Sequence, residues 1–350
     1  MQPIDYDYAV EISGPNMLMG RLTPDKPPVL TVNSGDIVKI ETINEIGADG
    51  VCTSRQYCQA QGIDLDGTMA GKLVCALEEL LQTDPQADGP WSIHRVTGPI
   101  AIRGAQPGDV LEVRILDTRL TIPWGNAMVF PHCGTVPDLV KTNAYHLVPF
   151  DRELLWGSFC GMRIPLHPFF GIMAVAPPHT VHAAPPGPFG GNMDNKRIVK
   201  GTSLYLPVQV SDALFYVGDP HAAQGNGEVS ICAIETAALT GIFQFVLHKN
   251  VPLTMPFIQT PTHYISVGLN CNLNDAVRQA TEQSIAFLQY KKGLNFNDAL
   301  MFCSIAVDYE ITQAVDQVLG VHGMIRKDIL DEDASDFWNA DGGVFYRNDL

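Results

Sequence analysis

The chain has 350 residues, of which 46% are hydrophobic and 17% are charged, so it carries enough apolar side chains for a large buried core. Its formal net charge of −16 argues against nucleic acid or an anionic membrane surface as a partner, because no basic field attracts them. A cation is the more natural ligand. The 31 glycines and 25 prolines favour many short strands joined by tight turns.

The sequence also predicts a cellular compartment. Residues 1–16 lack the apolar run of a secretory signal, and no stretch approaches the roughly 18 uninterrupted apolar residues of a membrane span. The eight cysteines are scattered and form no CxxC pair, which argues against a zinc–thiolate site. We therefore expect a cytoplasmic protein with reduced cysteines and no membrane partner.

Two similar segments in the first third of the chain predict paired strands. Residues 29–40 and 99–115 are rich in Val, Ile and Leu, and each has a Gly-Asp turn at its centre. Within them, residues 35–40 and 108–113 share the pattern G-D-[IV]-[VL]-[KE]-[IV]. Two matching hairpins of this kind predict a sandwich or a barrel.

The middle of the chain predicts a short helix, a loop region and a third β block. Residues 69–81 place several leucines on one helical face. Residues 120–165 are irregular and rich in Pro, Trp and His, so we expect loops around a site. Residues 172–235 contain strand-like apolar runs separated by polar turns.

The pattern becomes helical after about residue 246. Residues 274–293 have helical spacing, with Asn274 as the expected N-cap and Gly293 as the stop, and Asn295 is the expected cap of a second helix. We predict an α+β protein that is predominantly β. Its parts are a jelly-roll or sandwich-like region (1–245), a smaller α+β region with two helices (246–330) and an acidic tail (331–350).

Polar side chains gather between Gly190 and Glu235, on glycine-rich turns between the apolar runs. They are Asn192, Asp194, Asp219, His221, Gln224, Asn226, Glu228 and Glu235. Carboxylate and amide oxygens suit hard cations, and an imidazole nitrogen shifts the preference toward zinc. The cluster therefore predicts a hydrolytic site for a divalent metal, zinc or calcium.

Each of these residues also has a purely structural explanation. Asp219 stands before Pro220, where it is a common turn residue, and Asn192 follows glycines, where it tolerates a left-handed backbone. Glu228 and Glu235 are separated by an odd number of residues. On one regular strand they would face opposite sides, and only a bulge or loop would bring both to one pocket.

Several separated motifs make the chain resemble the acetamidase/formamidase family along nearly its full length. They are VTGPIAIRGAQPGDVLEV, HPFFGIMAVAP, GGNMDNKRIVKGTSLYLPV and GDPHAAQGNGEVSICAIE. The resemblance implies a metal-dependent amidohydrolase that releases ammonia from short linear amides such as formamide or acetamide. It also implies a mainly β fold with a jelly-roll-like portion and a homo-oligomer, a dimer or larger.

The resemblance assigns roles to individual residues. Asn192 and Asp194 occupy the family's GGNMD motif, and His167 occupies its HP motif. The GDxHxxQGxGE motif contains Asp219, His221, Gln224 and Glu228, and Glu235 is the acid that follows it. The implied metal ligands are Asp194, Asp219, His221, His167, Asn192 and Glu235. The implied catalytic residues are Asp219, His221 and Glu228, the last as general base, and the expected substrate contacts are Gln224 and His94.

Two other functions remain open at this point. A thiol amidase would use Cys232 as nucleophile, but Cys232 lies in the apolar run 229–234, where we expect an inert strand cysteine. A non-catalytic β protein that binds a metal or another ligand is the second alternative, because a jelly-roll fold does not decide between the two.

Overall fold

The computed structural model describes residues 4–44, 46, 53–84 and 93–330, so the predicted acidic tail lies outside the described residues. The described chain is mainly β, with the helices α1 (Ser54–Ala60), α2 (Met69–Thr83), α3 (Leu273–Lys292) and α4 (Phe296–Ala306). This confirms the predicted α+β class. None of the helices in these ranges has the length and apolar character needed to cross a membrane.

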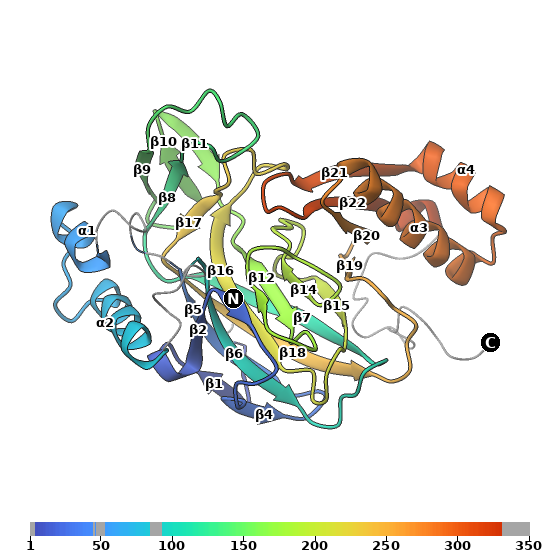
Figure 1. Ribbon diagram of the computed structural model, residues 1–350, viewed down its shortest axis with the longest axis horizontal. Helices are drawn as coiled ribbons and strands as arrows, with labels where there is room; N and C mark the ends of the chain where they lie inside the picture. Colours follow the sequence, from blue (N-terminus) through green and yellow to red (C-terminus); the bar gives the residue numbers. More distant parts are fainter. Residues whose placement is uncertain (1–3, 45, 47–52, 85–92, 331–350) are drawn as a thin grey trace.

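Two nine-stranded sheets form the body of the molecule (Figure 1). The first sheet contains, in spatial order, β1 (Tyr8–Val10), β5 (Ile37–Ile43), β18 (Ala238–His248), β7 (Val110–Leu120), β15 (Ser203–Pro207), β19 (Phe257–Gln259), β20 (His263–Asn270), β22 (Leu319–Arg326) and β21 (Val307–Gln313). The second contains, in spatial order, β14 (Gly190–Asn192), β12 (Phe169–Val175), β16 (Phe215–Ala223), β17 (Ile234–Thr236), β8 (Trp124–Val129) and β9 (Ala144–Pro149). In the same sheet β6 (Arg95–Ile102) also pairs with β16, and β2 (Met17–Met19) and β4 (Leu30–Val32) pair with β6. Two small ribbons pair β10 (Trp156–Phe159) with β11 (Met162–Pro165), and β3 (Arg21–Leu22) with β13 (Val181–His182).

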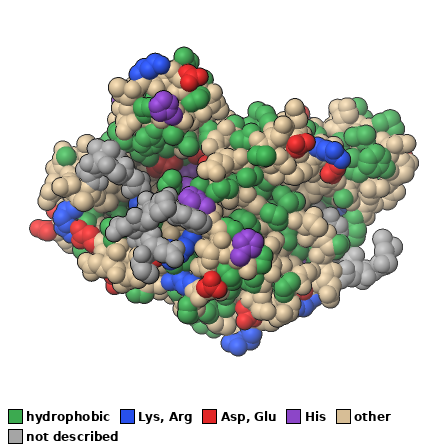
Figure 2. Space-filling model, in the orientation of Figure 1, with side chains coloured by type: hydrophobic (Ala, Val, Ile, Leu, Met, Phe, Trp, Pro, Cys, Tyr) green, Lys and Arg blue, Asp and Glu red, His purple; other side chains and the backbone are tan. Residues whose placement is uncertain are grey.

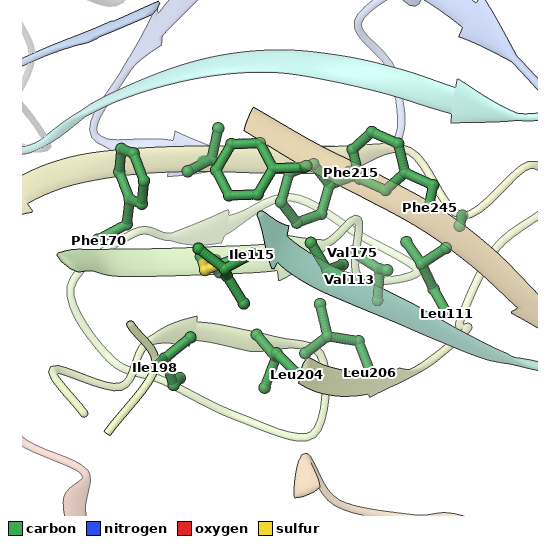
Figure 3. Close-up of a cluster of buried hydrophobic side chains, with 14 of the residues drawn as sticks. Leu111, Val113, Ile115, Phe170, Val175, Ile198, Leu204, Leu206, Phe215 and Phe245 are labelled. Carbon is green, nitrogen blue, oxygen red and sulfur yellow. The ribbon is translucent and has the colours of Figure 1, made fainter. Parts of the chain in front are cut away.

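The main hydrophobic core lies between these sheets, as in a β-sandwich. Figure 3 shows side chains of β7 and β15 from the first sheet, including Val113 and Leu204, meeting Phe170 and Val175 of β12 and Phe215 of β16. All of these side chains are buried. The site described below lies on β16 and its neighbours, so this core fixes its position.

The two similar N-terminal segments form strands, but the prediction of two hairpins is wrong. In each segment the first strand (β4 or β6) joins the second sheet and the following strand (β5 or β7) joins the first sheet. The Gly-Asp turns therefore carry the chain from one layer to the other. The two segments nevertheless occupy equivalent positions in the sheets. Their first strands, β4 and β6, pair in parallel with Leu30 opposite Ile100, and their second strands, β5 and β7, lie on either side of β18.

The other expected elements are mostly present. The helix predicted over 69–81 is α2, and Asn295 caps α4 by accepting a hydrogen bond from Asp298 N. The cap of α3 is Asn272, not Asn274, because the Asn272 side chain accepts hydrogen bonds from two backbone N–H groups of the first turn. The predicted loop region 120–165 instead contains β8 to β11, which form a lobe at the top of Figure 1.

The C-terminal helices lie at one end of the first sheet. α3 packs on β20 and β22, and α4 packs beside α3 (Figure 1). The predicted boundary between residues 245 and 246 falls inside β18, and the division into two domains stays a prediction.

Candidate active site

Strand β16 carries two of the predicted site residues into the interior. Asp219 and His221 are two residues apart on this strand and are buried. His221 Nε2 lies 3.1 Å from Asp219 Oδ2 and 3.2 Å from Glu235 Oε2. Glu235 reaches this position because β17 pairs with β16 and places Glu235 opposite His221.

The other ring nitrogen of His221, Nδ1, lies on the side of a second pair of acids, Asp194 and Glu228. His221 Nδ1 lies 3.7 Å from Asp194 Oδ1, and one ligand atom each of Asp194, His221 and Glu228 lie within 4.8 Å of one another. Asp219, His221 and Glu235 form an equivalent group. We call these five residues (Asp194, Asp219, His221, Glu228 and Glu235) the carboxylate centre. Glu228 precedes β17 in a loop, so the strand argument that separated it from Glu235 does not apply.

Gly171 on β12 makes room for the carboxylate centre. A Cβ at this position would lie 2.3 Å from Asp219 Oδ2 and 2.4 Å from Asp194 Oδ1, closer than real contacts permit. The Gly171 carbonyl accepts the backbone N–H of Asp194 at 3.2 Å. Glycine is therefore required where β12 passes under the acids.

Hydrogen bonds from neighbouring polar groups fix the orientation of these side chains. Asn44 Nδ2 donates to Asp219 Oδ1 at 3.1 Å and to Glu235 Oε2 at 2.7 Å. Gln224 Oε1 lies 3.2 Å from His221 Nδ1, and Gln224 Nε2 donates to the Asp194 carbonyl at 2.9 Å. Phe169 packs edge-on against the imidazole, with ring centroids 5.1 Å apart.

Three acids of the centre differ in their pKa, because burial acts to raise all three values while neighbouring charges and hydrogen bonds act differently on each. Burial raises the pKa of Asp194 to about 7, and burial together with the Asp194 charge raises the pKa of Glu228 well above its ordinary range. Burial acts against the charged form of Asp219 too, but the positive fields of His221 and His94 and the hydrogen bonds from His221 and Asn44 together outweigh it and lower the pKa of Asp219 to about 2. Burial also disfavours the charged form of His221, yet the Asp219 and Glu235 charges raise its pKa well above the usual value.

The donor set fits a divalent cation. Buried oxygens of Asn192, Asp194 and Glu228 (Oδ1, Oδ1 and Oε2) have no hydrogen-bond partner within the described part of the chain. A buried oxygen without a partner costs free energy that a bound cation recovers. Several carboxylates around one imidazole are ligands that suit zinc, and the extra oxygens also suit calcium.

The remaining predicted site residues lie in different places. Gln224 contacts the carboxylate centre, and the buried Asn192 on β14 stands two residues before Asp194. His94 lies beside the centre, where Asp219 and Glu235 influence its pKa, but burial lowers that pKa and its Nδ1 has no partner among the described residues. His167 is exposed and lines a cavity, so the structure does not bring it to the carboxylate centre with the other predicted ligands.

The prediction that Cys232 is a buried strand cysteine is wrong. Strand β17 begins at Ile234, so Cys232 belongs to the preceding loop, where it is half-buried and lines the same cavity. The variant Cys232→Ala therefore tests its role directly.

Two residues of the site have no counterpart in the sequence prediction. Asn44 bridges two acids of the carboxylate centre. Asp316 is buried beside Asp194, and burial together with the Asp194 charge raises its pKa well above the ordinary value. Both come from chain segments far from the 190–235 motifs, and neither lies in a motif that the sequence analysis identified.

A cavity of about 890 Å³ adjoins the centre. Gln224 and Ala233 line it and also hydrogen-bond members of the centre, Ala233 N donating to Glu235 Oε1 at 2.9 Å. Figure 2 shows a hollow beneath the lobe of β8 to β11 with acidic and histidine side chains at its bottom, whereas the lining of the cavity itself contains no described Asp or Glu. A small substrate therefore has space next to the buried acids.

The fold and the site together define a mainly β protein with a buried carboxylate–histidine centre next to a cavity. The sequence model of the acetamidase/formamidase family matches residues 91–184 and 179–331, and the chain belongs to this family.

Similar proteins agree with this placement. The chain is 29% identical over 284 residues to a putative formamidase of Schizosaccharomyces pombe, a match that covers 63% of this chain and 62% of that protein. It is 29% identical over 306 residues to the formamidase of Methylophilus methylotrophus, covering 69% of each. The crystal structure of an acetamidase from Bacillus halodurans superposes with a TM-score of 0.75 at 28% identity, covering 92% of this chain and 99% of that one.

Proposed function

We propose that the protein hydrolyses short linear amides of the formamide and acetamide type, releasing ammonia and a carboxylate, with a divalent metal ion held in the carboxylate centre. The observation that carries the proposal is the convergence of five buried ionisable side chains, two of them with an oxygen that has no hydrogen-bond partner among the described residues, in a chain of this family. Family membership favours this enzyme over a non-catalytic binding protein.

The residues that would hold the ion belong to the carboxylate centre. Asp194, Asp219 and His221 are the proposed principal ligands, with Glu235 as a further ligand and Asn192 Oδ1 available to complete the set. When bound, such an ion supplies Lewis acidity and lowers the pKa of water from 15.7 toward about 7. His167, exposed in the cavity wall, is assigned to the substrate side instead.

Glu228 is the proposed general base. An amide resists hydrolysis because its nitrogen lone pair is delocalised into the carbonyl, so the departing nitrogen needs a proton as well as an attacking water. The raised pKa of Glu228 lets this carboxylate accept a proton from water and return it to the leaving ammonia near neutral pH. Gln224 holds His221 in place through its hydrogen bond to Nδ1.

Ammonia release from formamide, acetamide and a panel of larger amides tests the function. We expect a chelator to remove activity and added zinc or calcium to restore it, while Cys232→Ala, which removes the thiol without filling the cavity, leaves turnover in place. Loss of activity in Cys232→Ala and not to the chelator would support the thiol amidase instead. Elemental analysis of the purified protein identifies the metal and its stoichiometry.

We also propose a homo-oligomer in the cytoplasm. On α4 the apolar side chains Phe296, Met301 and Ile305 are 56%, 58% and 83% exposed, which a contact between copies would cover. The scattered cysteines, which form no CxxC pair, support a reducing compartment. Light scattering of the wild type and of Ile305→Lys tests the assembly: a monomeric wild type would contradict it.

A further inference from the structure

The cavity beside the carboxylate centre is larger than formamide or acetamide requires. Its volume of about 890 Å³ lies in the range of sites that bind much larger ligands, roughly 300–1,000 Å³. Gln224 and Ala233 connect it to the centre through hydrogen bonds to His221 and Glu235. The cavity therefore has space for an acyl chain that extends away from the reacting amide.

The lining of the cavity is basic although the chain is acidic. Three cationic side chains, Lys196, Arg197 and Lys200, line it together with His167 and His263, and no described Asp or Glu is among the lining residues. The whole chain, in contrast, has 38 Asp and Glu against 22 Lys and Arg. A cavity with this lining attracts an anion.

Lys196 is the cation best placed to bind that anion. Arg197 is paired with Glu310 at 2.8 Å and Lys200 with Asp117 at 2.7 Å, whereas no described carboxylate lies within ion-pair distance of the half-buried Lys196. Lys196 also stands two residues after Asp194, so their Cα atoms lie within about 7 Å of each other. The same turn thus presents an acid to the centre and a cation to the cavity.

The rest of the wall suits a hydrocarbon chain. Phe159, Ile164, Ile234 and Met324 line the cavity between its polar groups. We propose, building on the amide hydrolysis proposed above, that the preferred substrate is the monoamide of a short dicarboxylic acid. Water adds its oxygen to the amide carbon, the C–N bond breaks, and the monoamide anion plus water gives the dicarboxylate plus ammonium; the distal carboxylate binds Lys196 and does not react.

Steady-state ammonia release from the metal-loaded, full-length protein tests this substrate class. We compare glutaric acid monoamide with pentanamide, which has the same chain length and no carboxylate. We expect kcat/KM at least about tenfold higher for the charged amide, as for a hydrogen bond between charged groups. Raising the salt concentration is expected to reduce this preference, because salt screens the attraction.

Variants at Lys196 distinguish the loss of its charge from a general loss of activity. Lys196→Met is expected to lower kcat/KM for glutaric acid monoamide about tenfold and for pentanamide less than twofold, while Lys196→Arg keeps the preference. Lys291→Met, on the exposed surface of α3 and outside the cavity, is the matched control and changes neither value.

The outcomes distinguish this inference from the function on which it rests. Equal turnover of the two amides, or an equal loss for both in Lys196→Met, overturns the proposed substrate class and leaves the amide hydrolase intact. If the metal-loaded protein releases ammonia from none of the amides, both proposals fail.

Discussion

At the scale of single residues, the acids of the carboxylate centre have an unusual backbone. Asp194, Asp219 and Glu228 have φ angles of +47°, +54° and +44°, in the left-handed region. A non-glycine residue there costs about 1–2 kcal/mol, and the cost is highest for residues other than Asn and Asp. Strained backbone conformations of this kind cluster at active sites and ligand-binding sites. The conformations of these three residues therefore agree with their proposed role.

Substitution of Asp219 tests that role without adding strain. Asp219→Asn keeps a residue that tolerates φ of +54° and an oxygen that accepts from Asn44, but it removes the negative charge that would hold the metal. We expect kcat to fall at least about a hundredfold with an unchanged circular dichroism spectrum. Asp212→Asn is the matched control, because Asp212 has φ of +59° in a turn outside the centre; equal losses in the two variants would contradict the assignment.

Glu228→Gln is expected to remove activity and to stabilise the metal-free protein. Burial raises the folded-state pKa of Glu228 far above the ordinary 4.5, so the native state loses stability relative to the unfolded state as the pH rises through this window. Glutamine is neutral and removes this penalty, a gain of about 1–2 kcal/mol.

Thermal unfolding in chelator between pH 4 and 8 measures this effect. The advantage of Glu228→Gln should be small near pH 4, where the glutamate is protonated in both states, and should grow toward pH 8. A variant that is less stable than the wild type at pH 8 would show that the Glu228 carboxylate is satisfied by contacts of the chain itself.

At the scale of elements, the β21–β22 hairpin holds the loop that carries Glu228. Gly227 N donates to the Thr312 carbonyl at 2.9 Å, and Ala314 N donates to the Gly227 carbonyl at 3.0 Å. On β21, Glu310 accepts hydrogen bonds from Asn226 in the same loop and from Arg197 and His322. The C-terminal part of the chain therefore positions a residue of the site.

Glu310→Gln is expected to weaken this support. The hydrogen bond from His322, supported by Arg197, holds the pKa of Glu310 well below its ordinary 4.5, so its stabilising effect is present above pH 4.5 and is lost as the pH falls through the lower folded-state pKa. Because Glu310 is partly exposed, we expect a loss of stability below about 1 kcal/mol at pH 7, together with a several-fold decrease in kcat.

Chemical denaturation at several pH values and steady-state kinetics measure both effects. The stability difference between Glu310→Gln and the wild type should shrink as the pH is lowered below 4.5. Asp308→Asn, an exposed residue on the same strand, should behave as the wild type. If kcat is unchanged in Glu310→Gln, the β21–β22 hairpin does not position Glu228 for catalysis.

Elements with local signals could be predicted from the sequence, and those with non-local causes could not. The cap at Asn295 and the leucine face of α2 depend on residues within one or two turns of a helix. Strand β9 has mostly exposed side chains, so it lacks the alternation that reveals a half-buried strand. The sheet that each strand joins depends on partners far away in the chain, which is why the two predicted hairpins were wrong.

At the scale of the whole molecule, the same distinction explains the site. The 190–235 motifs supplied all five residues of the carboxylate centre, because β14, β16 and β17 are close both in sequence and in the second sheet. Asn44 follows β5 of the first sheet, and Asp316 lies between β21 and β22. Only the sandwich brings these residues to the acids, so no local pattern marks them. His167 shows the reverse: its motif stands near the site, but its exposed side chain lines the cavity and does not join the carboxylate centre.

A buried group of mutually repelling acids also links metal binding to the stability of the whole protein. An ion that binds only the folded chain stabilises it by about 2.7 kcal/mol at a hundredfold excess over Kd, a rise of several degrees in Tm. We expect this rise on adding zinc or calcium to chelator-treated protein, measured by differential scanning calorimetry, and its loss in Asp194→Ala. Asp117→Asn removes a buried carboxylate that pairs with Lys200 outside the centre, so its Tm should still rise as in the wild type. If Asp194→Ala responds to the metal as the wild type does, the ion binds elsewhere and the carboxylate centre is not its site.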